Sequence, residues 1–386
     1  MAMKIIKTFL IIFFMVFICL PTIQYFNPVV KGKSVVENRT KAEWPQGSLW
    51  NGLIRGAGYT TTVERFFSDH FPLRDIMLRV LGQFEYSVLG RSREVIIGKE
   101  GWLSDKKVLA EQLHQLDRVN DEQIKASVIQ LKRFQHWLQG RGIDFLMVII
   151  PMKPTIYPEK FPEQYVQRPE QTGLQRFQKA LDNNGIPFID ALSILNEHKN
   201  EAPLFYKTDM HWNTVGISYV AEAMVNHFSS KIFGKRIWNE RLIKSEQVFS
   251  GQELSTMALL NPKSEITQKW ESAEPGYAVQ TLSDGTVGLY SGTDKTRALL
   301  PVSIMFGNSF MLQYPNVGYH AYFGQSFRVL DYQFFSKVLD YIKPEHKIFI
   351  LHIYETQLLF HILTSDSTYW DKRINDLHLP AGFQYR

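Results

Sequence analysis

Residues 140–153 read GRGIDFLMVIIPMK, an almost unbroken apolar run between glycines and a proline. A run of this length with such flanks is typical of a strand buried on both faces, as in a parallel sheet. The preceding segment, Asn120 to Gln139, carries apolar residues at helical spacing, and Asn120 with Gln123 predicts a capping box at its start. A helix followed by a doubly buried strand predicts an α/β protein.

The same order recurs downstream. A helix through Leu174, Phe177 and Leu181 is expected to end at Asn183-Asn184-Gly185, and a strand over Ile186–Asp190 follows. Further strands are predicted at 302–306, 327–331 and 347–353, with helices at about 214–228 and 334–342. Alternating helices and strands predict an α/β sandwich around a mostly parallel sheet.

Residues 232–300 break this rhythm, because they are polar and contain short alternating stretches such as Tyr277–Thr281. Ser283-Asp284-Gly285 has the composition of a turn. We expect a β-rich insertion here, forming a lid or a wall beside the functional site.

The charge of the chain is concentrated at its start. Lys and Arg number 43 against 38 Asp and Glu, a net charge of +5. The first 41 residues hold six basic side chains and one acidic one, so residues 42–386 carry equal numbers of each. A neutral body argues against a nucleic-acid-binding surface, which needs clustered basic residues. Apolar residues at 45% and charged residues at 21% exclude global disorder.

Residues 8–23 (TFLIIFFMVFICLPTI) carry no charge. With the apolar residues on either side they reach roughly 20 residues, about enough to cross a bilayer. Lys4 and Lys7 in front predict a cytoplasmic N-terminus and an exported body. We interpret the segment as an uncleaved signal-anchor; a cleaved signal peptide and a buried core helix are the alternatives.

The only cysteine, Cys19, lies inside that segment, which excludes a disulfide within the chain and a cysteine-based zinc site. The histidines show no metal-ligand spacing, so neither a metal nor a cofactor is predicted. The expected division is an anchor at 1–26, a juxtamembrane linker at 27–60 and one domain at 61–386.

The first motif that carries chemistry is YKTDMHWN, residues 206–213. Asp209 and His211 are two apart, so in extended backbone their side chains point to the same side. An Asp beside a His can fix its tautomer and stabilise the imidazolium formed when it accepts a proton. Asn213 or Thr214 can cap the helix that follows. The alternative is a purely structural Asp–His hydrogen bond in a turn.

The second motif is VSIMFGNSF, residues 302–310. A buried strand leads into Gly307 and Asn308, and Ser309 stands where a turn or helix begins. A sharp turn exposes a nucleophilic hydroxyl, and nearby backbone N–H groups can bind an oxyanion. Serine needs an adjacent base, which must come from a histidine elsewhere in the chain. Taken alone, Gly-Asn-Ser is also ordinary turn chemistry.

Together the two motifs resemble those of the SGNH-hydrolase-like O-acetyltransferases of the alginate AlgJ/AlgX type. Other segments match the same family: FFSDHFPLR at 66–74, VIIGKEGWL at 95–103, PMKPTIY at 151–157 and a diverged GQEL at 251–254. The resemblance covers about residues 61–360. It implies an SGNH-hydrolase-like α/β/α sandwich with a mostly parallel sheet, in which the histidine motif precedes the serine motif.

The resemblance implies a catalytic triad of Ser309, His211 and Asp209. The family's usual Asp before the serine is Asn308 here. Lys153 follows the carboxyl end of a predicted parallel strand, where ligand sites usually lie. Lys153, Asn308 and Trp212 are therefore candidate substrate contacts.

The activity that the resemblance implies is transfer of acetyl groups, through an acyl-enzyme, onto hydroxyls of a cell-envelope or secreted polysaccharide. The implied partners are the polysaccharide acceptor and a membrane-bound O-acyltransferase that supplies acetyl groups. The expected location is the inner membrane, with a single anchor and the domain in the periplasm or outside the cell. Two alternatives stay open: an esterase with the same triad, and a catalytically weak sugar-binding subunit of an exopolysaccharide complex.

Overall fold

The computed structural model describes residues 6–16, 19, 42–45, 57–71, 74–250, 253–258, 263–274, 276–282, 287–294, 296–330, 338–363 and 378–386. The chain divides into two compact units, Met1–Val95 with Gln252–Pro262, and Ile96–Gly251 with Lys263–Arg386. The boundary predicted at residue 60 falls inside helix α3 (Ala57–His70), and the one at residue 26 lies outside the described residues. The predicted division stays a prediction.

The smaller unit contains α3, α4 (Arg74–Leu89) and α12 (Glu253–Ala258). The segment expected to lead into the domain, 66–74, contains the end of α3 and the start of α4, and the Arg74 N–H donates to the Phe71 carbonyl at 3.0 Å. Residues 6–16 are helical. Within the described part of the chain, no helix combines the length and the apolar character needed to cross a bilayer.

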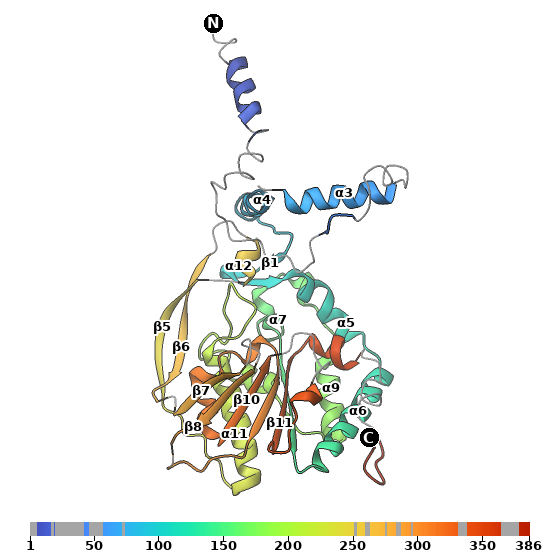
Figure 1. Cartoon of the computed structure of the whole chain (residues 1–386), viewed down its shortest axis with the longest axis vertical. Helices are drawn as coiled ribbons and strands as arrows, with labels where there is room; N and C mark the ends of the chain where they lie inside the picture. Colours follow the sequence, from blue (N-terminus) through green and yellow to red (C-terminus); the bar gives the residue numbers. More distant parts are fainter. Residues whose placement is uncertain are drawn as a thin grey trace. The chain divides into compact units, whose positions relative to one another are not determined.

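The larger unit is built on a seven-stranded sheet (Figure 1). Its strands lie in the order β4 (Phe188–Ile189), β3 (Asp144–Ile150), β11 (Ile348–Tyr354), β9 (Ser303–Gly307), β10 (Gln325–Leu330), β8 (Val287–Gly292) and β7 (Tyr277–Leu282). The first five are parallel, and β8 and β7 continue the sheet in antiparallel fashion. The predicted mostly parallel sheet is confirmed.

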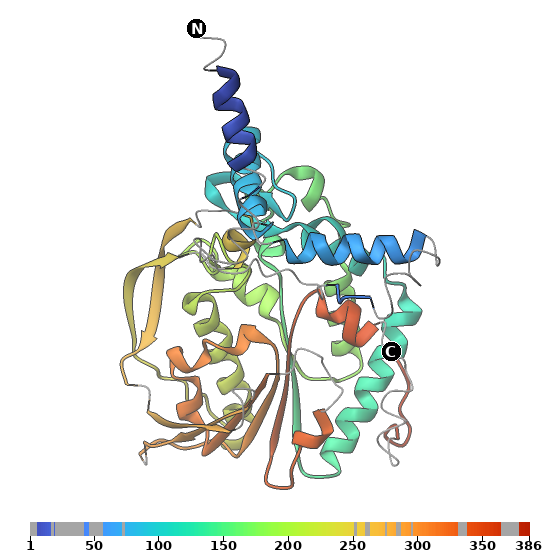
Figure 2. The ribbon, with the colours of Figure 1, turned by 45° about the horizontal axis from the view of Figure 1, so that its top comes forward.

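Strand β3 shows why the sheet is covered on both faces. Leu146, Val148 and Ile150 belong to one buried cluster, and the alternate residues Phe145, Met147 and Ile149 belong to another. The first cluster includes helices α10 (Ala191–His198) and α11 (Thr214–Phe233). The second includes α6 (Asp121–Gln139) and α9 (Gly173–Asn183), and Figure 2 shows α6 running alongside the sheet. Helices on both faces bury the strand as its apolar sequence predicts, and they make the α/β/α sandwich that the resemblance implies.

The predicted capping box of α6 and the predicted end of α9 are confirmed. The Asn120 side chain and the Gln123 side chain form the expected capping box at the start of α6. Helix α9 ends at Asn183, and Gly185 adopts φ +60°, a conformation that glycine reaches without strain. Helix α11 continues to Phe233, five residues beyond its predicted end.

The interpretation of 232–300 as an insertion is wrong in part. Strands β7 and β8 are integral to the main sheet, because β8 pairs with β10. Only β5 (Leu242–Ser250) and β6 (Ser264–Ser272) form a separate antiparallel hairpin. The predicted turn at 283–285 lies outside the described residues.

One predicted strand is shorter than expected, and one predicted helix is described only in part. The predicted strand over 186–190 is reduced to the two residues of β4. The helix expected at 334–342 is described only as α13 (Val338–Tyr341), because 331–337 lie outside the described residues. Further short elements are β1 (Val95–Ile97), β2 (Leu103–Asp105), α5 (Leu113–Asp117), α7 (Lys153–Ile156) and α8 (Glu163–Val166).

Candidate active site

The structure brings Ser309, His211 and Asp209 into one hydrogen-bonded chain. His211 Nε2 lies 2.7 Å from Ser309 Oγ, and His211 Nδ1 lies 2.7 Å from Asp209 Oδ1. A carboxylate can only accept, so Nδ1 carries the proton and Nε2 is left to accept from the serine hydroxyl. This is the arrangement that removes a proton from a serine nucleophile.

The three side chains of this hydrogen-bonded chain differ in how exposed they are to solvent. Asp209 is buried, with 7% of its side chain exposed, whereas 21% of the His211 side chain is exposed. Ser309 is also partly exposed. The hydroxyl and the imidazole are therefore accessible from solvent, while the carboxylate behind them is shielded from it.

The backbone between Asp209 and His211 differs from the expectation. Residues 207–211 form a series of bends rather than extended backbone. Asp209 Oδ1 reaches His211 because it also accepts the backbone N–H of His211 at 2.9 Å. The predicted pairing is confirmed, but it arises from a local turn and not from alternation along a strand.

Ser309 begins the short 3₁₀ helix η4 (Ser309–Met311), directly after β9. Gly307, the last residue of β9, passes so close to β11 that a Cβ there would lie 2.0 Å from the His352 carbonyl oxygen. Only glycine allows this approach. Gly307 thus allows β9 to lie close to β11 two residues before Ser309.

Asn308 caps η4 and does not face outward. Its Oδ1 accepts the Phe310 N–H at 2.9 Å, and its Nδ2 donates to Gln357 Oε1. The side chain is buried, at 2% exposure. The prediction that Asn308 contacts substrate is wrong, because its polar atoms are engaged inside the protein.

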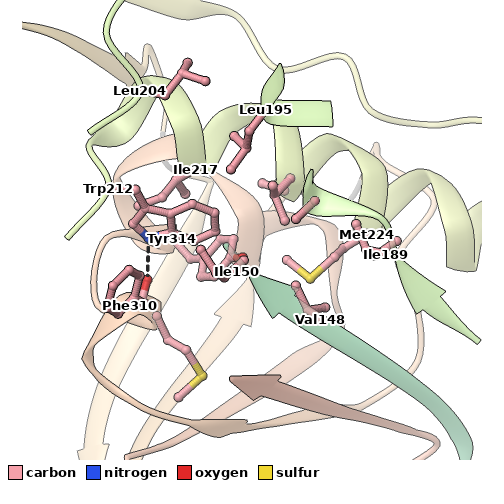
Figure 3. Close-up of a cluster of buried hydrophobic side chains, with 14 of the residues drawn as sticks. Val148, Ile150, Ile189, Leu195, Leu204, Trp212, Ile217, Met224, Phe310 and Tyr314 are labelled. Atoms are coloured by element: carbon pink, nitrogen blue, oxygen red, sulfur yellow. Dashed lines mark hydrogen bonds between the residues drawn. The ribbon is translucent and has the colours of Figure 1, made fainter. Parts of the chain in front are cut away.

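Trp212 is also internal. Its indole Nε1 donates to the Phe310 carbonyl at 2.8 Å, shown as the dashed line in Figure 3, and the ring packs edge-on against Tyr314. Trp212 is 1% exposed, so the predicted substrate contact is wrong here too. The residue instead ties the histidine loop to the serine helix.

Asn213 confirms its expected role at the start of α11. Its Oδ1 accepts the N–H groups of Val215 and Gly216 at 3.0 and 3.2 Å, and its Nδ2 donates to the Pro203 carbonyl at 2.7 Å. The cap joins the loop that carries His211 to a long buried helix.

Lys153, at the carboxyl end of β3 as predicted, points into the protein. Its Nζ donates to the carbonyls of Tyr206, Lys207 and Asp209 at 2.9, 3.0 and 2.7 Å. These bonds use all three ammonium protons, and the residue is 1% exposed, so the predicted substrate contact is wrong. Burial lowers the pKa of Lys153 to about 7, against the opposing effects of Asp209 and Glu265.

Glu265, on β6, is a site residue that the sequence did not indicate. Its Oε2 accepts the Lys207 N–H at 2.8 Å, and its Oε1 accepts the Thr208 N–H and hydroxyl at 2.9 and 2.7 Å. Nothing in the polar sequence of 264–272 distinguishes this acid from its neighbours. The predicted wall beside the site does exist, as the β5–β6 hairpin.

The chain also matches a known protein family. The family model described as "SGNH hydrolase-like domain, acetyltransferase AlgX" matches residues 95–300, more than half of the chain. That range includes Asp209 and His211 and ends before Ser309.

The prediction that no metal or cofactor is needed stays a prediction.

Curated relatives agree with the family model. A "Probable alginate O-acetylase AlgJ" of Azotobacter vinelandii is 27% identical over 188 residues, covering 45% of this chain and 47% of the relative. The protein of the same name from Pseudomonas aeruginosa is 25% identical over 193 residues, covering 50% and 46%. The chain thus spans about half the length of the curated relatives it matches.

Among solved structures, the O-acetyltransferase domain of Pseudomonas putida AlgJ is similar over 73% of this chain and 100% of that one, at 13% identity and a TM-score of 0.49. This likeness is too weak to support the fold by itself, which rests on the sheet and the family match. With an α/β/α sandwich, the expected motif order and a family model that covers over half of its residues, the chain belongs to the SGNH hydrolase-like acetyltransferase family of AlgX.

Proposed function

We propose that this protein is an O-acetyltransferase that moves acetyl groups onto hydroxyls of a polysaccharide, with Ser309 as nucleophile. The observation that carries the proposal is the hydrogen-bonded chain from Ser309 Oγ through the His211 ring to Asp209, with 2.7 Å at each step. The names of the curated AlgJ relatives support an acetylated polysaccharide as the product class.

In the proposed reaction, His211 Nε2 takes the proton of the Ser309 hydroxyl as Oγ attacks the carbonyl carbon of the acetyl donor. The tetrahedral intermediate collapses when the protonated His211 returns the proton to the leaving group, and acetyl-Ser309 remains. A sugar hydroxyl then gives its proton to His211 and attacks the acetyl carbonyl. Ser309 leaves with the proton from His211, and the acetylated sugar is released.

Two other groups have roles in these steps. Asp209 holds the imidazole with Nδ1 protonated and stabilises the positive charge that the ring gains in each half-reaction. The N–H of Ser309 has no partner inside η4, because it is the first residue of that helix. It is available as one donor to the oxyanion of the tetrahedral intermediate.

The proposal includes an exported location on a membrane anchor. It rests on the uncharged stretch 8–23 behind Lys4 and Lys7 and on the neutral body that follows. A membrane-bound O-acyltransferase would then supply the acetyl groups. Carbonate washing of membranes from cells that express the full chain tests the anchor, since release of the chain would contradict it.

The test of the activity uses purified protein, an activated acetyl ester and an oligosaccharide acceptor. We expect acetylated oligosaccharide from the wild type and none from Ser309→Ala. Ser303→Ala is the matched control, because Ser303 is buried at the start of β9, the strand that precedes Ser309, and its hydroxyl has no hydrogen-bond partner among the described residues. Acetate release that is indifferent to the oligosaccharide would show an esterase instead.

A further inference from the structure

The loop that carries Asp209 and His211 lies between two charged side chains of opposite sign. Lys153 holds it from one side through the carbonyls of Tyr206, Lys207 and Asp209. Glu265 holds it from the other through the N–H groups of Lys207 and Thr208. The backbone carbonyls of the loop accept from the Lys153 ammonium, and its backbone N–H groups donate to the Glu265 carboxylate. Each contact is therefore a charge-assisted hydrogen bond.

The loop needs such partners because it is irregular. Residues 207–211 belong to no helix or strand, so neighbouring backbone cannot satisfy their N–H and C=O groups in the usual repeating way. One of the three carbonyls that accept from Lys153 Nζ is that of Asp209 itself, and the N···O distance is 2.7 Å. The lysine therefore fixes the main chain of the residue whose side chain orients His211.

Residues 151–157, which include Lys153, make a second contact just before this loop. Tyr157 lies four residues on, and its hydroxyl accepts the N–H of Leu204 at 3.1 Å. Trp102 packs beneath both residues, with its ring centroid 4.7 Å from that of Tyr157 and 5.7 Å from Lys153 Nζ. The proposed activity by itself gives residues 151–157 and Trp102 no role. Their contacts show that they pack against the segment that carries His211 and stabilise it.

We propose that Lys153 and Glu265 are positioning residues of the triad, which together hold the 206–209 loop where Asp209 can orient His211 toward Ser309. Neither residue touches the reacting atoms. The inference rests on the proposed function for its nucleophile, and it adds two residues that act through the loop. A loss of either residue slows the reaction of Ser309 because the proton acceptor is displaced.

The charge of Lys153 gives the arrangement a pH dependence. Three groups face its ammonium: the Asp209 carboxylate from the loop, the Glu265 carboxylate from β6, and the Trp102 ring. Burial lowers its pKa to about 7, so its proton is lost as pH rises through neutrality. The neutral amine keeps two donors for three carbonyls, and the hold on the loop weakens. The reactivity of Ser309 should therefore fall on the alkaline side.

The test measures how fast Ser309 reacts with a sulfonyl fluoride, from about pH 6 to about pH 9, by mass spectrometry of the intact protein. We expect Lys153→Met to react at least about ten-fold more slowly than wild type at neutral pH and to lack the alkaline decline. Lys132→Met is the matched control, because Lys132 Nζ also donates to a loop carbonyl, that of Gly185, away from the triad. A rate for Lys153→Met within about two-fold of the Lys132→Met rate, with the same pH profile, would overturn the inference.

A second variant decides the question if Lys153→Met does not fold. Glu265→Gln replaces one accepting oxygen with a donor that faces a backbone N–H, and we expect its labelling rate to fall about ten-fold. Glu246→Gln on the neighbouring strand is its control, because Glu246 is exposed and accepts a hydrogen bond from Gln268, away from the histidine loop. In Glu265→Gln, the proton resonance of the His211 Nδ1–H should also shift. An unchanged resonance and rate would contradict the positioning role.

The probe needs neither an acetyl donor nor a sugar, so the two proposals can fail separately. If wild type labels at Ser309 but transfers no acetyl group, the proposed function is wrong and the positioning of the triad stands. If the variants label as fast as wild type, the positioning is wrong and the proposed function stands.

Discussion

Asn308 stands where the resemblance to the AlgJ/AlgX-type acetyltransferases leads to the expectation of Asp. In this structure its two polar atoms have different partners, because Oδ1 accepts from Phe310 and Nδ2 donates to Gln357 Oε1. Gln357 Oε1 also accepts the Tyr354 N–H, at 3.2 Å, which fixes the amide in this orientation. The network is therefore built for an amide at position 308.

Asn308→Asp should destabilise the protein in a pH-dependent way. The new carboxylate would place an oxygen against Gln357 Oε1 in a buried site, so its pKa should rise above the ordinary value of about 3.9. The cost, about 1–3 kcal/mol, is small at low pH, where the group is protonated in both states, grows as pH rises from the ordinary pKa to the raised one, and is complete above it. Urea unfolding at about pH 5 and about pH 8 measures it. Asn316→Asp, at an exposed position, is the control, and equal stability of Asn308→Asp and wild type at the higher pH would contradict the account.

At the residue scale, the sequence identified the reactive groups better than their surroundings. The structure brings Asp209, His211 and Ser309 into one hydrogen-bonded chain, although the turn that pairs the first two is not the extended backbone that their spacing predicts. Lys153 was placed correctly at a strand end, but its direction depends on three carbonyls that no sequence pattern records. A charged side chain at a strand end can face either solvent or backbone, and only the fold decides between them.

At the scale of elements, α11 sets the position of the histidine loop. Its cap, Asn213, is fully buried and satisfies two backbone donors while its own amide donates to Pro203. A buried cap has no water to replace it, so its loss leaves those groups unsatisfied. The start of the helix and the loop before it are thus stabilised by one side chain.

Asn213→Ala should lower the free energy of unfolding by about 2–3 kcal/mol, because both a cap and buried hydrogen bonds are lost. Asn120→Ala, which removes the exposed cap of α6, provides the comparison and should cost only about 1 kcal/mol. Urea denaturation followed by circular dichroism gives both values. Equal costs for the two variants would show that burial of the Asn213 cap adds nothing.

Elements with strong apolar periodicity were predicted closely, and polar ones were not. Strand β3 and helix α6 lie within one residue of their predicted starts, because their apolar faces must be buried. Strands β7 and β8 were recognised as β-structure but assigned to an insertion. Their pairing with β10 is set by contacts distant in sequence, which local alternation cannot specify.

At the scale of the whole molecule, the core contains buried histidines that influence stability. His352, on β11, is fully buried with Nε2 3.1 Å from the Tyr314 hydroxyl, and burial lowers its pKa to about 3. His320 is fully buried against Tyr290, and burial lowers its pKa well below the ordinary value. Both rings are therefore neutral in the folded protein at pH values where the unfolded chain is protonated.

This difference predicts acid sensitivity. From about pH 6.5 downward the unfolded state binds protons that the folded state excludes, so stability falls as pH falls, until about pH 3 for His352. The slope is about 1.4 kcal/mol per pH unit for each such histidine. Urea unfolding of wild type and His352→Gln between about pH 7 and about pH 5 tests this, with exposed His378→Gln as control. The same slope in all three proteins would contradict it.

Trapping of the acyl-enzyme shows whether Ser309 carries the acetyl group. The full chain is mixed with an activated acetyl ester, quenched in acid, digested and mapped by mass spectrometry. We expect one acetyl group on the peptide that contains Ser309, and none there in Ser309→Ala. Acetylation that persists undiminished in Ser309→Ala, or that forms on another residue of the wild type while Ser309 stays unmodified, would contradict it.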